Sequence, residues 1–263
     1  SFALAVALQQ PTPPQRAVTD PGVIATGQRV SPAGVQTVFD GRVGGVRFGR
    51  RSEEIWVAAP GNVFRLQWQA NRVVARAALD GRPGVFGVTM DPVTHRAFVS
   101  FVGRVPATSV PGEARPRAMA QLHVFGADAE GDSAVSLSNS GALGDFMAGA
   151  SAVAALADSS GRRVGVLPLP ANDELAVFNA ANASVIRFVP LGVEPIAAVI
   201  SADGRVAYVS ILGGPKPAAA DRAARQCCDA RAEAVRVDAR GIAERGSVTR
   251  VDLVEGTVVR DIT

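Results

Sequence analysis

The residues best suited to chemistry in this sequence are the neighbours Cys227 and Cys228, the only two cysteines in the chain. A disulfide between neighbours closes a strained ring that is easier to reduce than an ordinary disulfide. Three states are open: a vicinal disulfide, pairing with cysteines of another segment, or two free thiols. Zinc is not expected, because C-x-x-C spacing is absent. We therefore expect no metal site.

Arginines flank this pair in a long irregular stretch that contains Arg225 and Arg231. If the ring between Cys227 and Cys228 forms, it is a stiff, apolar, sulfur-faced projection on an arginine-bearing loop. Such a projection is suited to press on a ligand or to cover an opening. The sequence therefore predicts ligand binding by Cys227, Cys228, Arg225 and Arg231.

Other reactive side chains lack the partners that catalysis needs. His95 stands in a turn and His123 in a strand, without a nearby nucleophile or acid in the sequence. Ser100 and Ser210 each end a strand pattern without a G-x-S-x-G elbow. The D-x-E-x-D spacing at 128–132 resembles a calcium loop, but it lacks the bidentate glutamate and reads as a hairpin turn. We expect no catalytic residue and no cofactor.

A repeat of about 42 residues determines how all these groups are positioned. Trp56 and Phe98 occupy matching places 42 residues apart, and Gly165 and Tyr208 are aligned at 43. Each unit reads as four short strands, with Asp-Gly or Ser-Gly turns supplying positive φ. The pattern predicts an all-β chain, a β-propeller of four-stranded antiparallel blades.

The predicted blades lie at about 45–84, 85–149, 150–195 and 196–263. The stretch 35–41 reads as an outermost strand that precedes them. Small residues are expected where the first strands of the blades converge on the axis. They are Gly45, Gly87, Ala154, Ala155, Ala197 and Ala198.

Two insertions interrupt the repeat, at 101–120 and 211–245. Both fall between the second and third strands of a blade, so up-and-down strand order places them on one face of the disc. Loops this long are uncommon without a role. We expect this face to meet a ligand or a protein partner.

The motif Ala207-Tyr208-Val209-Ser210 resembles the YVTN-type β-propeller repeats of bacterial secreted and surface proteins, and the resemblance covers about 35–263. It implies a ring of about seven blades, of which this chain holds about four. The stretches Cys227-Cys228-Asp229, 235–241 and 246–248 resemble the propeller half of bacterial proteins that carry an alkaline-phosphatase-superfamily phosphoesterase downstream. On that resemblance, any phosphoesterase activity lies beyond Thr263.

Two enzyme classes form the alternative to a binding scaffold, each with its site at the channel mouth. A similar vicinal disulfide contacts the cofactor in quinoprotein dehydrogenase propellers, although the tryptophan-docking repeats of that family are absent. Trp56 and Trp68 are therefore expected to pack in the core or at the rim. Propeller lactonases share the repeat, yet their polar channel cluster of His, Glu and Arg is not recognisable here.

Composition limits the partners and the compartment. The chain is 48% hydrophobic with a net charge of +3. Arginine alternates with acidic residues and there is one tyrosine, which argues against nucleic acid. An apolar run of membrane-spanning length is absent, so no membrane span is expected. Ala5-Val6-Ala7 resembles a signal cleavage site, so residues 1–34 read as a signal remnant and Pro-rich leader of a periplasmic or secreted protein.

Overall fold

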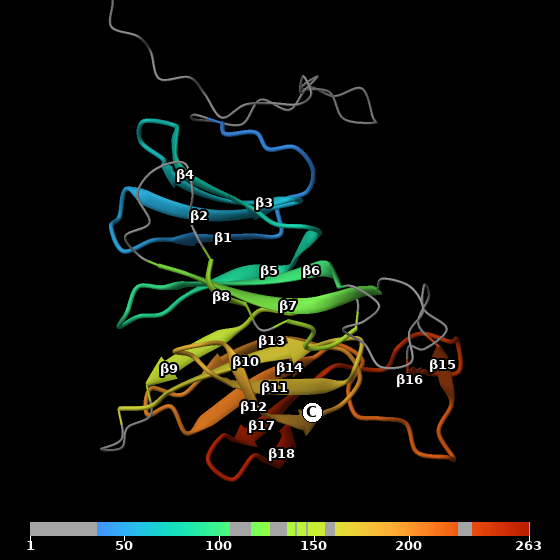
Figure 1. The fold of residues 1–263 in the computed structure, drawn as a ribbon. Coiled ribbons are helices and arrows are strands. Elements are labelled where there is room, and N and C mark those ends of the chain that lie inside the picture. Colours follow the sequence, from blue (N-terminus) through green and yellow to red (C-terminus); the bar gives the residue numbers. More distant parts are fainter. Residues whose placement is uncertain are drawn as a thin grey trace, which may run out of the picture.

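The computed structural model describes residues 36–105, 117–126, 136–139, 141–145, 147–155, 161–225 and 233–262. Within these ranges it contains eighteen β-strands and no helix. Sixteen of the strands form four antiparallel sheets of four strands each (Figure 1). The predicted all-β class with four-stranded antiparallel blades is confirmed.

Each blade is numbered in chain order, and its strands are called a to d in the order in which they pair. Blade 1 comprises β1 (Gly45–Phe48), β2 (Glu54–Ala59), β3 (Asn62–Gln67) and β4 (Arg72–Ala78). Blade 2 comprises β5 (Arg82–Met90), β6 (Ala97–Val105), β7 (Arg117–Phe125) and β8 (Ser136–Asn139). Blade 3 comprises β9 (Ala152–Ala155), β10 (Arg163–Leu169), β11 (Glu174–Asn179) and β12 (Ser184–Pro190). Blade 4 comprises β13 (Pro195–Ile200), β14 (Val206–Ile211), β17 (Ser247–Asp252) and β18 (Thr257–Ile262), with β15 (Ala223–Arg225) and β16 (Ala234–Arg236) as a separate hairpin.

Alternating side chains explain why these segments are strands. Along β14, Ala207, Val209 and Ile211 are buried, while Tyr208 and Ser210 between them are exposed. Successive residues of a strand point to opposite faces of the sheet, so one face of blade 4 packs on blade 3. Val209 and Ile211 accordingly share a core with residues of β10 and β11.

Apolar layers between successive blades hold the arc together. Trp56 of blade 1 lies 6.0 Å from Phe125 of blade 2, measured between ring centroids. Phe98 of blade 2 lies 5.9 Å from Phe178 of blade 3. Each of these rings is almost completely buried. Burial of side chains this large is the main source of stability in the blade stack.

The a strands of neighbouring blades approach closely enough to require small residues, as predicted. The Gly87 amide donates to the Gly44 carbonyl at 3.1 Å. A Cβ atom on Gly45 would lie 2.7 Å from the amide nitrogen of Val88. Between blades 3 and 4, Ala150 forms a parallel bridge with Ala197. Larger side chains at these positions would push the blades apart.

The a–b turns adopt the backbone conformation expected of them. Gly161 and Gly204 have φ of 64° and 74°. In blade 2 the positive φ of this turn falls on His95, at 55°, and the turn begins at Asp91, whose carboxylate accepts hydrogen bonds from the amides of Val93 at 2.8 Å and Thr94 at 3.1 Å. An aspartate that caps its own turn stabilises the reversal without glycine.

Three sequence expectations need correction. Residues 36–41 form no strand and cross blade 1 instead, where Phe39 lies 5.0 Å from the Phe64 ring. The insertion expected at 101–120 is narrower, because β6 and β7 pair in continuous register out to Val105 and Arg117. Blade 2 begins at Arg82, where β5 starts, rather than at 85.

The alignment of Gly165 with Tyr208 is also wrong, by one residue. Gly165 pairs with Phe178 on the face toward blade 2, whereas Tyr208 lies on the exposed face of blade 4. A slip of one residue moves a side chain to the other face of the sheet. The equivalent of Gly165 is Ala207, which restores a spacing of 42 between blades 3 and 4.

Candidate functional site

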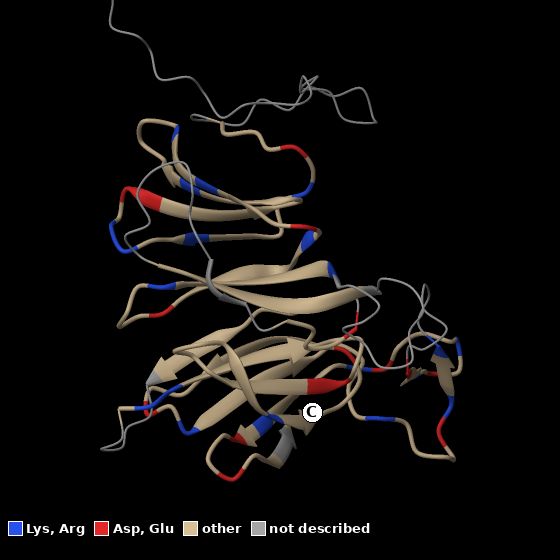
Figure 2. Ribbon diagram, in the orientation of Figure 1, with Lys and Arg blue, Asp and Glu red and all other residues tan. Residues whose placement is uncertain are grey.

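One face of the arc carries the connections from strand b to strand c and from strand d to the next strand a, and we call it the elaborated face. The β15–β16 hairpin arises there, between strands b and c of blade 4. Figure 1 shows this hairpin projecting at the right, clear of the stacked blades. Charged residues of both signs are interspersed on the connections and strand ends of the molecule (Figure 2).

A small apolar cluster docks the hairpin region onto the blades. Val235 and Val237 are buried against Val193, which lies in the connection between blades 3 and 4, and Ala224 packs on the same cluster. The Val193 amide donates to Gly214 at 2.8 Å, and the Gly213 amide donates back to Val193 at 2.9 Å. This part of the insertion is therefore built into the face.

Lys216 adds an electrostatic anchor to this docking. Its Nζ lies 3.4 Å from Oδ2 of Asp173 in blade 3 and 3.2 Å from Oε1 of Glu233 on the far side of the hairpin. Burial raises the pKa of Asp173, although the Glu194 amide and Lys216 both oppose the shift. Burial opposes the charged form of Lys216, but its hydrogen bond to Glu233 and the charge of Asp173 outweigh this and raise its pKa. Each charge of the pair therefore favours the ionised form of the other.

A cavity of about 760 Å³ opens on the same face, beside the a strands of blades 1 and 2, and we call it the channel-mouth cavity. Its walls come from the start of β1, the start of β5, the b–c turn of blade 1 and the connection from blade 2 to blade 3. The lining residues are Arg42, Val43, Gly44, Gly45, Val46, Pro60, Arg82, Pro83, Gly84, Val85, Phe86, Val102, Met147 and Ala148. Its volume lies within the usual range of small-molecule sites, about 300 to 1,000 Å³.

Phe86 is the most unusual residue of the cavity wall. Its side chain is 64% exposed, and its φ of 50° lies in the left-handed region, which a bulky residue rarely adopts. The pairing of β5 with β6 shifts between Pro83 and Val88, so Phe86 stands on an irregular part of the strand. Such irregularities re-aim side chains and are common beside binding sites.

Backbone hydrogen bonds on both sides hold Phe86 in this conformation. The Val85 amide donates to the Ala148 carbonyl at 2.9 Å, and the Gly87 amide donates to the Gly44 carbonyl at 3.1 Å. Gly84 packs so tightly that an added Cβ would lie 2.4 Å from Oγ of Ser100. Neighbouring blades therefore impose a backbone state that Phe86 itself disfavours.

Arg42 and Arg82 give the cavity wall its charge. Both residues are exposed and line the cavity together with apolar residues. The lining residues that the structure describes include no acidic side chain. Within the described part of the chain, the Arg42 guanidinium has no carboxylate partner. The cavity thus combines an apolar wall with positive charge.

Of the predicted ligand residues, Arg225 alone lies within the described part of the chain, and it does not line this cavity. Cys227, Cys228 and Arg231 fall outside the described residues, so the disulfide hypothesis stays a prediction. Arg225 ends β15, where it is exposed and pairs with Ala234 on β16. The 128–132 segment also lies outside the described residues.

The two histidines have different environments. His123 is buried between blades 1 and 2, where its ring stacks on Phe125 and meets the edge of Phe101. Burial lowers its pKa to about 4. His95 lies in the a–b turn of blade 2 with a φ of 55°. Neither histidine lines the channel-mouth cavity.

The serines and tryptophans that the sequence singled out serve the architecture. Ser100 is buried and donates its hydroxyl to the Gly149 carbonyl at 2.9 Å, which joins blade 2 to the next connection. Ser210 donates to Ala197 within blade 4. Trp56 packs in the core, and the Trp68 indole donates to the Ser52 carbonyl at 2.7 Å.

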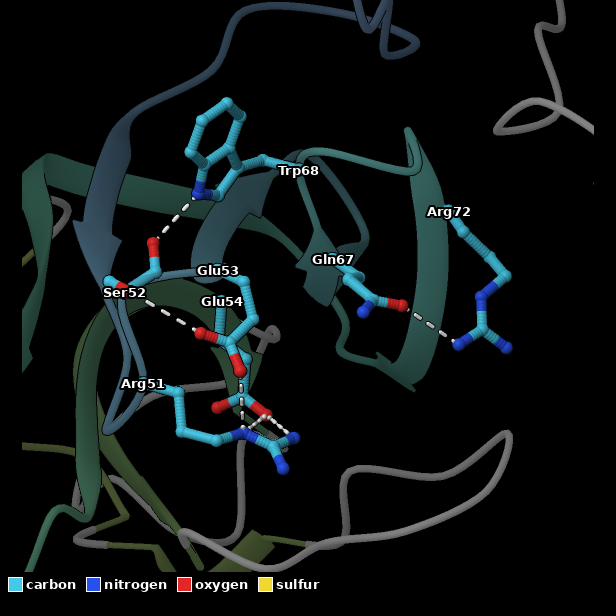
Figure 3. A network of polar contacts seen from close by, with 7 residues as sticks. All are labelled: Arg51, Ser52, Glu53, Glu54, Gln67, Trp68 and Arg72. Carbon is cyan, nitrogen blue, oxygen red and sulfur yellow. Dashed lines mark hydrogen bonds and ion pairs between the residues drawn. The ribbon is translucent and has the colours of Figure 1, made fainter.

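Figure 3 shows the turns around Trp68. Arg51 pairs with Glu54, and Arg72 donates to Gln67 at 2.9 Å. These contacts stay within the a–b and c–d ends of blade 1, on the face opposite the cavity. These contacts stabilise the turns. The residues drawn form neither a metal site nor a catalytic arrangement with one another.

The described residues contain no group of three or more His, Cys, Asp or Glu side chains that could hold a metal ion. No helix among them is long and apolar enough to cross a membrane. The sequence analysis did not single out Arg42, Arg82 and Phe86 as site residues. The available signal was an aromatic residue between two glycines, in Gly84-Val85-Phe86-Gly87.

No protein-family model and no curated protein sequence matches this chain. Among solved structures it is similar to hydrazine synthase of Kuenenia stuttgartiensis, with a TM-score of 0.52 and 11% identity over 88% of this chain and 52% of that chain. A chain of the mitotic checkpoint complex matches with a TM-score of 0.47 and 10% identity, over 68% and 49% of the two chains. The chain thus spans about half the length of the hydrazine synthase chain that it matches. At so low an identity the likeness concerns the fold alone, and the chain has an all-β, propeller-type fold.

Proposed function

We propose that this chain is a non-catalytic β-propeller scaffold that holds a ligand in the channel-mouth cavity of its elaborated face. The observation that carries the proposal is Phe86, an exposed aromatic side chain kept on a disfavoured backbone at the cavity wall. Strain of this kind persists where the surroundings impose it, and it clusters at binding sites. The docked β15–β16 hairpin adds a second structural elaboration to the same face.

Binding is favoured over catalysis by the chemistry of the cavity wall. Among the residues that the structure describes, its lining includes no histidine, acid, serine or cysteine that could transfer a proton or attack a substrate. The enzyme alternatives, a lactonase-like or quinoprotein-dehydrogenase-like propeller, need polar or cofactor-binding groups at the channel mouth. Assays with sugar lactones and with quinone cofactors are therefore expected to show no turnover.

The wider setting of the proposal rests on the sequence alone. The YVTN-like motif around Tyr208 and the signal-like Ala5-Val6-Ala7 support an exported bacterial protein, periplasmic or secreted. The similarity around Cys227 supports attachment to a phosphoesterase and a larger ring of blades. In that setting the propeller presents a ligand or protein partner to the attached domain.

A thermal-shift screen of small molecules tests the proposed site. Val85 is a cavity residue that is 37% exposed, so Val85→Trp is expected to obstruct the cavity without changing the core. Val259→Trp, at a 48% exposed position on β18, is the matched control. Compounds that raise the unfolding temperature of the wild type should lose this effect in Val85→Trp and keep it in Val259→Trp. Equal responses from all three proteins would contradict the proposal.

A further inference from the structure

The composition of the channel-mouth cavity also points to the chemical class of its ligand. Four apolar residues of the wall are substantially exposed: Val43 at 37%, Val46 at 52%, Val85 at 37% and Phe86 at 64%. Contact between apolar surface and water is unfavourable. An apolar group that covers this surface therefore stabilises the complex by about 25 cal/mol per Å² buried. An exposed apolar patch within a concave wall marks a place where another molecule binds.

The charges of the same wall exclude a purely apolar or cationic ligand. Among the residues that the structure describes, Arg42 and Arg82 are the charged residues of its lining. The Arg42 guanidinium can recognise carboxylate, sulfonate or phosphate oxygens through several N–H donors held in one plane. A cation placed beside Arg42 would meet repulsion, and the described lining residues supply no acid to compensate it.

We infer that the channel-mouth cavity binds a small amphiphilic anion, with its apolar ring or chain on Phe86, Val85 and Val46 and its anionic group on Arg42. This inference rests on the proposed function and specifies its ligand. The rigid backbone around Phe86 means that the aromatic contact is present before the ligand arrives. Preorganisation of this kind reduces the entropy lost on binding.

A matched pair of fluorescent probes tests the ligand class on the full chain. The probes are 8-anilinonaphthalene-1-sulfonate and N-phenyl-1-naphthylamine, which share the aromatic body and differ in the sulfonate. We expect the sulfonate to bind at one site per chain and at least about tenfold more tightly than the neutral probe, as for one charge-assisted hydrogen-bonding group.

Variants assign the two halves of the ligand to their residues. Arg42→Gln should weaken sulfonate binding about tenfold and leave the neutral probe unchanged, because only the charged contact is lost. Phe86→Ala should weaken both probes while retaining the left-handed backbone. Arg240→Gln and Phe188→Ala alter an exposed arginine and a 44% exposed phenylalanine outside the cavity, and neither should have an effect.

The outcomes separate the ligand class from the proposed function. Equal affinity for both probes, with no effect of Arg42→Gln but a loss in Phe86→Ala, would overturn the anionic class and leave the binding site in place. Binding that Phe188→Ala reduces as much as Phe86→Ala would show a general apolar surface, and would overturn both the ligand class and the site. Competition by inorganic phosphate at concentrations as low as those of the sulfonate probe would also overturn the amphiphilic class, because the anionic group alone would then bind as tightly as the whole probe.

Discussion

Phe98 and Phe86 lie in the same blade and have opposite environments. Phe98 is fully buried and packs on Phe178, as expected of an apolar residue on the face of a strand that contacts the next blade. Phe86 is 64% exposed on left-handed backbone, in a strand that has lost its regular pairing. Phe98 lies on a strand that pairs regularly with its neighbour, whereas Phe86 departs from a regular strand in backbone conformation, pairing and exposure.

We interpret the inter-blade layers as the part that holds the blades together and the channel mouth as the part that is open to other molecules. Local preference and global structure agree through most of a natural protein, and conflicts concentrate at functional sites. The inter-blade layers are therefore expected to govern stability, and the channel mouth to govern binding. The variants below test each half of that division.

The largest loss of stability is expected from breaking the ion pair between blades 2 and 3. Arg163 bonds both carboxylate oxygens of Asp91, and the exposed fractions of their side chains are 14% and 1%. Arg163→Met leaves Asp91 buried without its partner, which costs about 3 to 5 kcal/mol. Urea denaturation measures this loss.

Arg240→Gln is the control for that substitution. Arg240 pairs with Asp238 at the surface, where its side chain is 76% exposed. Exposed ion pairs contribute little to stability, so this variant should unfold at nearly the wild-type urea concentration. Equal losses from the two variants would mean that the Asp91 pair is not a special link between blades.

A smaller effect, dependent on pH, is expected from His123. Burial lowers its pKa from 6.5 to about 4, so the unfolded chain binds a proton more readily than the folded one. The wild type should therefore lose stability as the pH falls from about 6.5 towards 4, by up to about 3 kcal/mol. Unfolding free energies of the wild type and His123→Leu between pH 7 and about pH 4 measure this difference.

His95→Asn provides the comparison, because His95 lies in a turn whose positive φ asparagine tolerates. This variant should retain the acid sensitivity of the wild type, and His123→Leu should have lost most of it. Unchanged acid sensitivity in His123→Leu would show that other groups cause the effect.

The hairpin anchor is expected to contribute less. Lys216 is 45% exposed, so Lys216→Met should cost about 1 kcal/mol of global stability after screening by solvent. Its clearer result is local: trypsin should cleave the β15–β16 region faster than in the wild type, because Asp173 no longer holds it. The raised pKa of Asp173 also predicts a dependence on pH, since the folded protein favours the neutral carboxyl of this residue. Stability should therefore fall as the pH rises through this carboxyl's titration, and more steeply in the variant.

The regular parts of the blades could be predicted from sequence, and the cavity could not. Alternation in β14 and the glycines of the a–b turns predicted strands and reversals, because these depend on local preference. The register of Tyr208 was missed by one residue, since the a–b turn of blade 3 holds one residue more than that of blade 4. The cavity depends on Gly44, before β1, and on Ala148, between blades 2 and 3, whose carbonyls accept hydrogen bonds from the amides on either side of Phe86 only in the folded arc.

Phe86→Gly tests whether the channel mouth is the binding site, because this one substitution removes both the backbone strain and the aromatic contact. Glycine adopts positive φ without penalty, so the variant should be more stable than the wild type by about 1 kcal/mol. It should also bind 8-anilinonaphthalene-1-sulfonate less tightly than the wild type. Urea unfolding and a fluorescence titration on the same preparation give both values. A variant that is less stable, or that binds the probe as well as the wild type does, would contradict the assignment of the channel mouth as the binding site.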